Sequence, residues 1–263
     1  MKKRMILLIV LCFVSLITFC GATYAGFSKQ YNPKIDGLNF TVATQENMMI
    51  STTGEKGTFK DNIDFSDLVP NSVTLNPLKG NVTENSITLF DGNYIAQENN
   101  NYIKFTLYFS GSNDMDIYLE GSTSGTVIDT LKIENSIFTD EQIAKIVDSL
   151  RIGFVAYSTR EIPTGNEVEI RYDPIDTNVY SLNEKNDSSY KTFKPYETFN
   201  NIGHTSGILN DVVLLETNAN KVSKMDIFIW LESEDINCNE SIFNSMLQIN
   251  LRFLAVKKES GDR

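Results

Sequence analysis

Histidine is almost absent from this chain, which has one, His204, among 263 residues. A single histidine excludes zinc sites of His-x-x-x-His spacing and every site that needs two imidazoles. It does not by itself exclude a Ser–His–acid triad, but the sequence also lacks a Gly-x-Ser-x-Gly elbow and a glycine-rich phosphate loop. We therefore predict no catalytic residue and no organic cofactor, and we interpret His204 as a surface side chain of a polar loop.

Long apolar runs are also missing, apart from one of 15 residues between Met5 and Phe19. That run is shorter than the roughly 20 residues that span a bilayer as a helix. Lys2, Lys3 and Arg4 precede it, and the small residues of 21–25 follow. This pattern predicts a secretory signal peptide over residues 1–25, cut by a signal peptidase, and a secreted or cell-surface protein with no stable membrane span after cleavage. A retained membrane anchor is the alternative.

Cysteine is scarce, and two of the three cysteines, Cys12 and Cys20, lie in the predicted signal peptide. Cys238 is left alone in the mature chain and has no partner for an internal disulfide, so the core must supply the stability. As a nucleophile, Cys238 would need a base nearby. None is adjacent in sequence, and we interpret Cys238 as a packed small residue.

Basic residues are outnumbered, with 23 Lys and Arg against 34 Asp and Glu. Removal of the three basic residues of the signal peptide leaves 20 − 34, a net charge of −14. Phosphate binding needs clustered Lys and Arg, so nucleic acid is excluded as a partner. Cations or a basic surface of another protein would suit this charge better.

What the sequence does have is alternation of apolar and polar residues at period two, clearest in Lys224–Asp235. Such alternation predicts a strand with one face against a core. An imperfect copy occurs at Asp114–Gly121, and each copy leads through a possible short helix to another strand, 150–156 and 249–255 respectively. We interpret this as a pseudo-repeat in one β-rich domain.

The pattern of the whole chain predicts a mainly β protein, an antiparallel β-sandwich of jelly-roll type with one or two short helices. We divide it into an N-terminal arm at 26–37, a single domain at 38–256 and a charged tail at 257–263. A helix is expected from Thr139, because Thr139 and Gln142 have capping-box spacing. Further strands are expected at 38–51, 63–68, 72–78, 86–90, 126–133, 151–158, 168–172, 208–217 and 246–256, with a long loop at 173–201 and a short helix or turn near 241–245.

Two aromatic or alternating segments suggest local arrangements. Tyr102–Ser110 and the segment 114–121 are separated by a turn sequence, which predicts a hairpin. On the outer face of the expected strands lie Tyr102, Tyr108, Tyr118, Phe228 and Trp230. An exposed strip of this kind would bind sugar or another subunit, whereas burial under a second layer is the more ordinary outcome for Phe228 and Trp230.

Acidic and amide side chains crowd the loop after Glu232. Asp235, Asn237 and Asn239 match the first three ligand spacings of a calcium loop, but Glu240 stands where the loop needs glycine and Met246 where it needs glutamate. The loop is therefore no EF-hand. It remains a candidate calcium site of another kind, with a plain solvated loop as the alternative.

Two segments resemble a known family. Ala22–Ser28 (ATYAGFS) is similar to the A-T-x-A-x-F-(S/T) ending of exported proteins cut by a SipW-type peptidase, with Lys29 where an Asp often follows. Trp230–Cys238 resembles a W-L-E-G-x-D-x-x-C segment of related Gram-positive proteins, with Ser233 in place of the glycine. The nearest characterised group is that of TasA and camelysin. The resemblance covers the first 28 and the last 40 or so residues.

The resemblance implies a secreted jelly-roll protein of the cell surface or biofilm matrix, assembled by donation of the N-terminal segment to the next subunit. The donor here would be residues 26–37, and the partner would be the chain itself or a related matrix subunit. Such donation is β-augmentation of an open sheet edge. Camelysin relatives are classed as metallopeptidases, an activity that does not carry over without a histidine-based zinc signature. A secreted metal-dependent hydrolase and a monomeric binding module remain the alternative functions.

Overall fold

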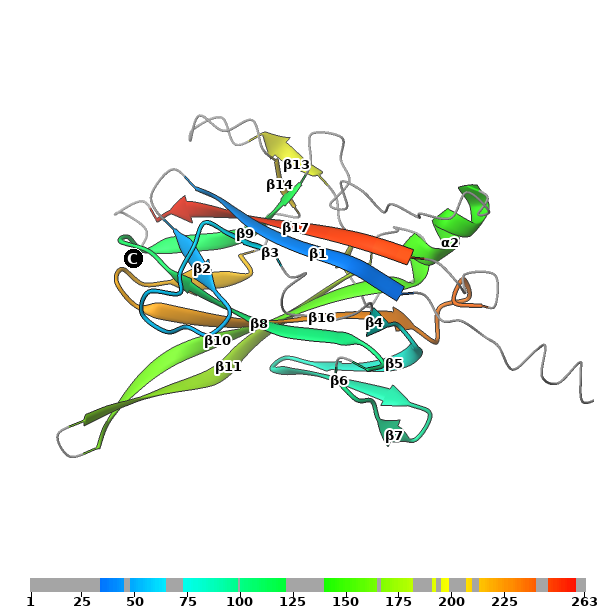
Figure 1. Cartoon of the computed structure of the whole chain (residues 1–263), viewed down its shortest axis with the longest axis horizontal. Helices are drawn as coiled ribbons and strands as arrows, with labels where there is room; N and C mark the ends of the chain where they lie inside the picture. The colour runs from blue at the N-terminus through cyan, green and yellow to red at the C-terminus, as the bar shows by residue number, and fades with distance from the viewer. Residues whose placement is uncertain are drawn as a thin grey trace, which may run out of the picture.

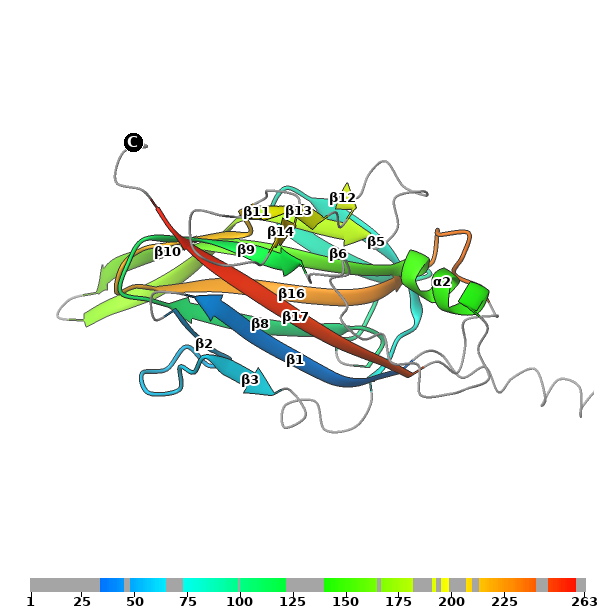
Figure 2. The same ribbon diagram turned by 90° about the horizontal axis from the view of Figure 1, so that it is seen from above.

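The computed structural model describes residues 34–44, 48–64, 73–98, 100–121, 140–164, 167–181, 191–192, 195–198, 207–209, 213–239 and 246–258. Within these ranges the protein is mainly β, with two sheets packed over each other (Figures 1 and 2). The predicted sandwich-like architecture is therefore confirmed. A jelly-roll order of its strands stays a prediction.

The first sheet has eight described strands, and its main path ends at β3 beside the N-terminal strand. In order across the sheet these are β13 (Pro195–Thr198), β14 (Gly207–Leu209), β9 (Met115–Gly121), β17 (Met246–Lys257), β1 (Lys34–Thr44) and β3 (Asn62–Asp64), with β15 (Leu215–Thr217) beside β9 and β4 (Val73–Thr74) beside β1.

The second sheet has nine described strands and curls at one end. Its order is β12 (Lys191–Thr192), β11 (Glu167–Ser181), β10 (Leu150–Thr164), β16 (Val222–Glu232), β5 (Pro77–Thr83), β6 (Ser86–Asp91) and β7 (Tyr94–Ile95), with β8 (Ile103–Ser110) beside β16 and β2 (Met49–Ser51) beside β8. Helix α2 (Asp140–Ser149) runs straight into β10.

Most strand pairs are antiparallel, as the sequence predicts, and three described pairs are parallel: β1 with β17, β5 with β16, and β11 with β12. A parallel pair cannot be joined by a tight turn and needs a long crossover. For β1 and β17, the first and last described strands, nearly the whole chain is the crossover.

The predicted pseudo-repeat appears in the strand pairing as a topological two-fold. One unit is β8–β9–β10 and the other is β15–β16–β17. Strand β8 pairs with β16 as β15 pairs with β9, and β9 pairs with β17 as β16 pairs with β10, all antiparallel. The two units thus interlock, each crossing between the sheets twice. Because β16 pairs on both sides over eight residues, with β8 and with β10, it lies at the centre of its sheet.

The predicted hairpin of 102–110 with 114–121 is wrong. Strand β8 pairs with β2 and β16 in one sheet, whereas β9 pairs with β14, β15 and β17 in the other. The turn at Gly111–Asp114 therefore carries the chain between sheets. It is held by the matching turn before β16, because Asn220 donates its N–H to the Gly111 carbonyl (2.8 Å) and Ala219 donates to Asp114 Oδ1 (2.8 Å). Alternation predicts a strand but not its partner.

Other boundaries differ from expectation. Strand β11 continues to Ser181, well into the predicted loop 173–201, which also contains β12 and β13. The expected strand 208–217 is two short strands, β14 and β15. Strand β1 begins at Lys34, inside the N-terminal arm of 26–37 that is expected as a possible donor strand. The signal peptide, the strand expected at 126–133, His204 and the helix expected near 241–245 lie outside the described residues.

The core has two parts, one on each face of β16. Between the sheets lie Met225, Ile227, Ile229 and Leu231, with ring contacts such as Phe109 against Phe253 at 5.6 Å. On the other face, Phe228 and Trp230 are buried with side chains of β5, β6 and β10. The predicted burial of both aromatic residues is confirmed, and Tyr102, stacked on Phe228 at 6.3 Å, is also buried. The proposed exposed aromatic strip is thus absent at these three positions.

Among the described residues, no helix has the length and apolarity needed to cross a membrane.

Candidate functional site

Strand β16 and the turn that follows it carry charged residues that are buried. These are Asp226, Glu232 and Asp235, with exposed fractions of 3%, 3% and 8%. Burying an unpaired charge is costly, so each must be held by donors. Together with Arg151 they form the part of the described structure where titratable groups concentrate, and we treat this region as the candidate site.

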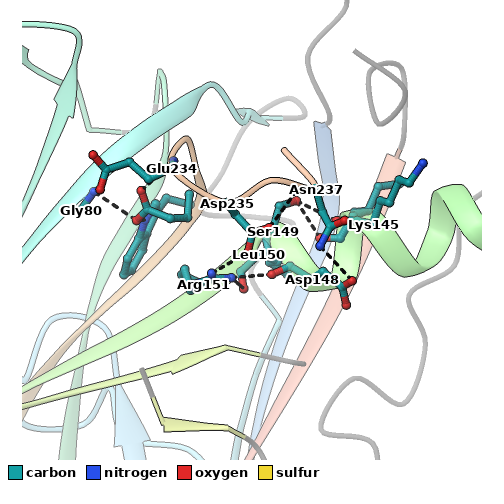
Figure 3. A network of polar contacts seen from close by, with 12 residues as sticks. Gly80, Lys145, Asp148, Ser149, Leu150, Arg151, Glu234, Asp235 and Asn237 are labelled. Atoms are coloured by element: carbon teal, nitrogen blue, oxygen red, sulfur yellow. Dashed lines mark hydrogen bonds and ion pairs between the residues drawn. The ribbon is translucent and has the colours of Figure 1, made fainter. Parts of the chain in front are cut away.

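Of the ion pairs between described residues, that of Arg151 and Asp235 is the most deeply buried. Arg151 is the second residue of β10, and its Nη2 donates to Asp235 Oδ2 at 2.7 Å, with both side chains 1% exposed (Figure 3). The other terminal nitrogen donates to the carbonyls of Asp148 (2.5 Å) and Leu150 (3.2 Å). Since those carbonyls belong to the end of α2 and the start of β10, this guanidinium ties the helix–strand junction to the turn after β16.

The predicted calcium ligands are placed by the same network. Asp235 Oδ1 accepts the backbone N–H of Asn237 at 2.9 Å, and the Asn237 amide donates to Asp148 Oδ2 at 3.1 Å (Figure 3). The Asn239 amide donates to the Ile236 carbonyl at 3.3 Å. Both oxygens of Asp235 thus already accept hydrogen bonds, and a guanidinium stands where a cation would bind.

Among the described residues, no group of three or more His, Cys, Asp or Glu side chains lies close enough to hold a metal ion. Calcium binding by Asp235, Asn237 and Asn239, two of which are amides, stays a prediction.

Glu232 accepts hydrogen bonds from several parts of the chain at the end of β16. Its Oε2 accepts the indole N–H of Trp230 and the backbone N–H of Gly80, each at 3.2 Å, and Oε1 accepts the N–H of Glu234 at 3.3 Å. A Cβ at Gly80 would lie 3.0 Å from Glu232 Oε2 and 3.2 Å from the indole, so a larger residue there would push the carboxylate or the indole aside. The carboxylate therefore joins β5 to β16 beyond the point where their ladder ends.

Asp226 lies at the centre of a third polar group, halfway along β16. It accepts hydrogen bonds from Thr106 Oγ1 (2.7 Å) and Tyr157 Oη (2.8 Å), and its oxygens lie 3.6 Å and 3.4 Å from the ammonium groups of Lys104 and Lys224. Burial, together with the hydrogen bond to the carboxylate, raises the pKa of Tyr157 well above its usual range. The phenol stays protonated and serves as a donor.

Cys238 is half-buried and packs against the core between the sheets. Burial, and secondarily the charges of Asp235 and Glu232, raise the pKa of its thiol to about 12. A thiol with such a pKa is protonated at neutral pH and is a poor nucleophile. The interpretation of Cys238 as a packed residue agrees with this geometry.

Taken together, these buried polar groups hold separate strands and the helix junction against one another. Each buried carboxylate is matched by donors from a different strand or from the helix junction. Sequence reasoning missed Arg151, Asp226 and Glu232 as members of the networks. The available signal was a charged residue inside an otherwise apolar strand, such as the Arg in LRIGFVA at 150–156.

Comparison of the chain with protein-family models, with curated proteins and with solved structures gives no match.

Proposed function

We propose that this chain is an exported, non-enzymatic structural protein of the cell surface or extracellular matrix. In this proposal it assembles with copies of itself, or with a related subunit, by donation of its N-terminal strand. The export part rests on the signal-peptide pattern of residues 1–25, and the matrix part on the resemblance at 22–28 and 230–238. The buried polar groups support a structural role, because their donors and acceptors are engaged in holding strands together.

The observation that carries the assembly step is the position of β1. On one side it pairs in parallel with β17 at nine residue positions from Lys34 to Thr44. On the other side its partners among the described strands are the short β3 and β4, at three and two positions. A terminal strand held by one main ladder can leave its own sheet and pair identically with the β17 of another copy.

The energetic argument is that of domain swapping. The donated strand makes the same hydrogen bonds in the next copy as in its own, so exchange costs little in contacts. Donation from each copy to the next does not close, and it yields a fibre. The predicted donor segment, residues 26–37, overlaps the start of β1, and the chain that follows Thr44 would connect the donated strand to the rest of its own copy.

A cross-link between β1 and β17 tests the proposal directly. Thr41 and Arg252 are register partners, and paired strand positions are within disulfide distance. The variant that tests this carries Thr41→Cys and Arg252→Cys in a Cys238→Ser background. It would form a disulfide within one chain if β1 pairs with the β17 of its own copy. If β1 is donated, oxidation of assembled protein gives a ladder of covalent multimers on a non-reducing gel.

The matched control uses a pair that cannot exchange. Asn81 and Thr88 face each other across the β5–β6 hairpin, so Asn81→Cys with Thr88→Cys should yield only monomers under the same oxidation. A ladder from the β1–β17 pair and none from the control supports strand donation. If both cysteine pairs give only monomers under conditions where light scattering detects polymers, the strand-donation proposal is wrong.

A further inference from the structure

The hairpin of β10 and β11 extends beyond the rest of the molecule (Figures 1 and 2). Its two strands pair continuously from Tyr157 with Pro174 to Thr164 with Glu167. Strand β16 accompanies β10 only as far as Tyr157. A two-stranded ribbon is at best marginally stable on its own in water. A partner that adds a strand to the projecting part would therefore stabilise it.

The outer edge of β11 is open over most of its length. Among the described strands its only other neighbour is β12, which pairs at Tyr180 and Ser181. Val168 and Ile170 on this edge strand are 59% and 52% exposed. An open edge that carries exposed apolar side chains is a template for adding another strand.

Pro174 indicates which backbone groups point outward. Proline in a sheet is tolerated where its missing N–H would face away from the neighbouring strand. By the alternation of an antiparallel ladder, the backbone groups of Tyr172, Ile170 and Val168 then also face outward. The backbone groups of Glu169 and Arg171 face β10. In a pair with an added strand, Glu169 and Arg171 would therefore occupy non-hydrogen-bonded positions, where side chains on opposite strands lie closest.

The two charges that flank Ile170 are self-complementary. If a second β11 adds antiparallel with Ile170 opposite Ile170, then Glu169 faces Arg171 and Val168 faces Tyr172, each twice by symmetry. At each end of the pair Glu167 faces Asp173, whose charge is already balanced by Arg160 and Arg171 of its own chain at 2.7 Å and 3.4 Å. Centring on Arg171 would oppose two arginines and bring Glu169 against Asp173, and centring on Glu169 would oppose two glutamates. Like charges directly opposite are destabilising, which disfavours the registers centred on Arg171 and on Glu169. Centring on Tyr172 would oppose Arg171 with Asp173, but it places Pro174, which has no N–H, at a hydrogen-bonding position opposite Ile170, so a hydrogen bond is lost at each end. The register centred on Ile170 loses no such bond between residues 168 and 172.

We propose that the open edge of β11 binds the β11 of a second copy of this chain, antiparallel and centred on Ile170, to form a two-fold dimer. The dimer continues the second sheet of one copy into that of the other. The surface is separate from β1, and the contact closes at two copies instead of forming an open chain. It does not depend on the proposed strand donation.

Charge exchange tests the pairing and its register. In the chain from Gly26, Arg171→Glu alone and Glu169→Arg alone should each weaken dimerisation about tenfold or more, since both symmetric pairs become like-charged. An equimolar mixture of the two variants should dimerise again, because one chain then presents two acidic and the other two basic residues. The double variant Glu169→Arg with Arg171→Glu should dimerise like the original. Sedimentation velocity over a concentration series measures all four.

A cysteine cross-link distinguishes this dimer from other associations. With Cys238→Ser as background, Ile170→Cys should form a covalent dimer on mild oxidation, because residue 170 faces itself. Val168→Cys is the matched control, since residue 168 faces 172 and should not cross-link. Circular dichroism confirms that each variant is folded. A chain that stays monomeric into the millimolar range, or a mixture that fails to restore dimers, would overturn the proposal and assign Glu169, Arg171 and Pro174 to blocking the edge instead.

The experiments distinguish the two assembly proposals, strand donation by β1 and edge pairing by β11, because each predicts a result that the other does not. Charge variants of β11 leave the cross-link of Thr41→Cys with Arg252→Cys unchanged if only strand donation occurs. The ladder is absent, and charge-dependent dimers persist, if only the β11 contact occurs.

Discussion

Arg151 and Asp235 meet inside the protein at 2.7 Å, although 84 residues separate them along the chain. The exposed pair of Arg160 and Asp173 has the same 2.7 Å separation, with side chains 57% and 37% exposed. The two pairs have the same N–O distance and differ most in burial. Arg151 also donates to the carbonyls of Asp148 and Leu150, and Asp173 also pairs with Arg171 at 3.4 Å, so loss of Arg160 leaves Asp173 with a cation.

Arg151→Gln is expected to lower the free energy of unfolding by about 3–5 kcal/mol, because it leaves the Asp235 carboxylate buried without its cation. Arg160→Gln should cost no more than about 1 kcal/mol, as an exposed pair does. Urea unfolding, followed by the fluorescence of Trp230, compares the two. Equal costs would show that the buried pair is not a structural tie.

Gly153 makes room for the buried indole of Trp230. A Cβ at this position would overlap Ile87 Cδ1 and lie 3.2 Å from the indole. Gly153→Ala should therefore destabilise the protein by about 1–3 kcal/mol through overpacking. Ile87→Val removes the clashing atom and alone should cost about 0.5–1.5 kcal/mol. The double variant is expected to be more stable than Gly153→Ala, which thermal unfolding would detect, and strict additivity of the two costs would contradict the packing argument.

The sequence was sufficient for the strands whose alternation is clean, such as β8, β9, β16 and β17. It was also sufficient for the pseudo-repeat, because repetition of a pattern along the chain is visible without coordinates. The sequence did not predict which strands pair with each other. The turn at Gly111–Asp114 has the composition of a hairpin turn, yet it joins strands of two different sheets. The turn is hydrogen-bonded to the distant turn at Asn220, a contact that local composition does not encode.

The candidate site was predictable in place but not in role. The acidic turn at Asp235 stands out in the sequence as a possible cation site, and spacing alone favours calcium. The cation that Asp235 binds is Arg151, which lies 84 positions away in an apolar segment. Local spacing contains no information about such a partner, so the structural use of the carboxylate was not visible.

Calcium is accordingly expected to leave the unfolding temperature unchanged. A ligand present at a hundred times its dissociation constant would stabilise the fold by about 2.7 kcal/mol, which a thermal scan with calcium or with chelator resolves easily. Both Asp235 oxygens are engaged by Arg151 and Asn237, so no such gain is expected there. A calcium-dependent rise that disappears in Asp235→Asn would restore the calcium site and contradict the role assigned to the ion pair.

Cys238 should react slowly with thiol reagents in the folded protein at pH 8 and rapidly in urea. Burial raises the pKa of the folded thiol to about 12, whereas the unfolded thiol ionises near 8.5.

Below the unfolded pKa both states are protonated, and the thiol adds no pH dependence. Above it the unfolded state loses a proton that the folded state retains, so stability falls as pH rises toward 12. The free energy of unfolding of the original chain, measured against Cys238→Ser, should therefore be flat up to about pH 8 and decline above it. Tyrosines with raised pKa values titrate alike in both chains and cancel in the difference. Fast reaction at pH 8 without urea, or a difference that stays flat to pH 11, would show that the thiol is accessible and ionises as an exposed cysteine does.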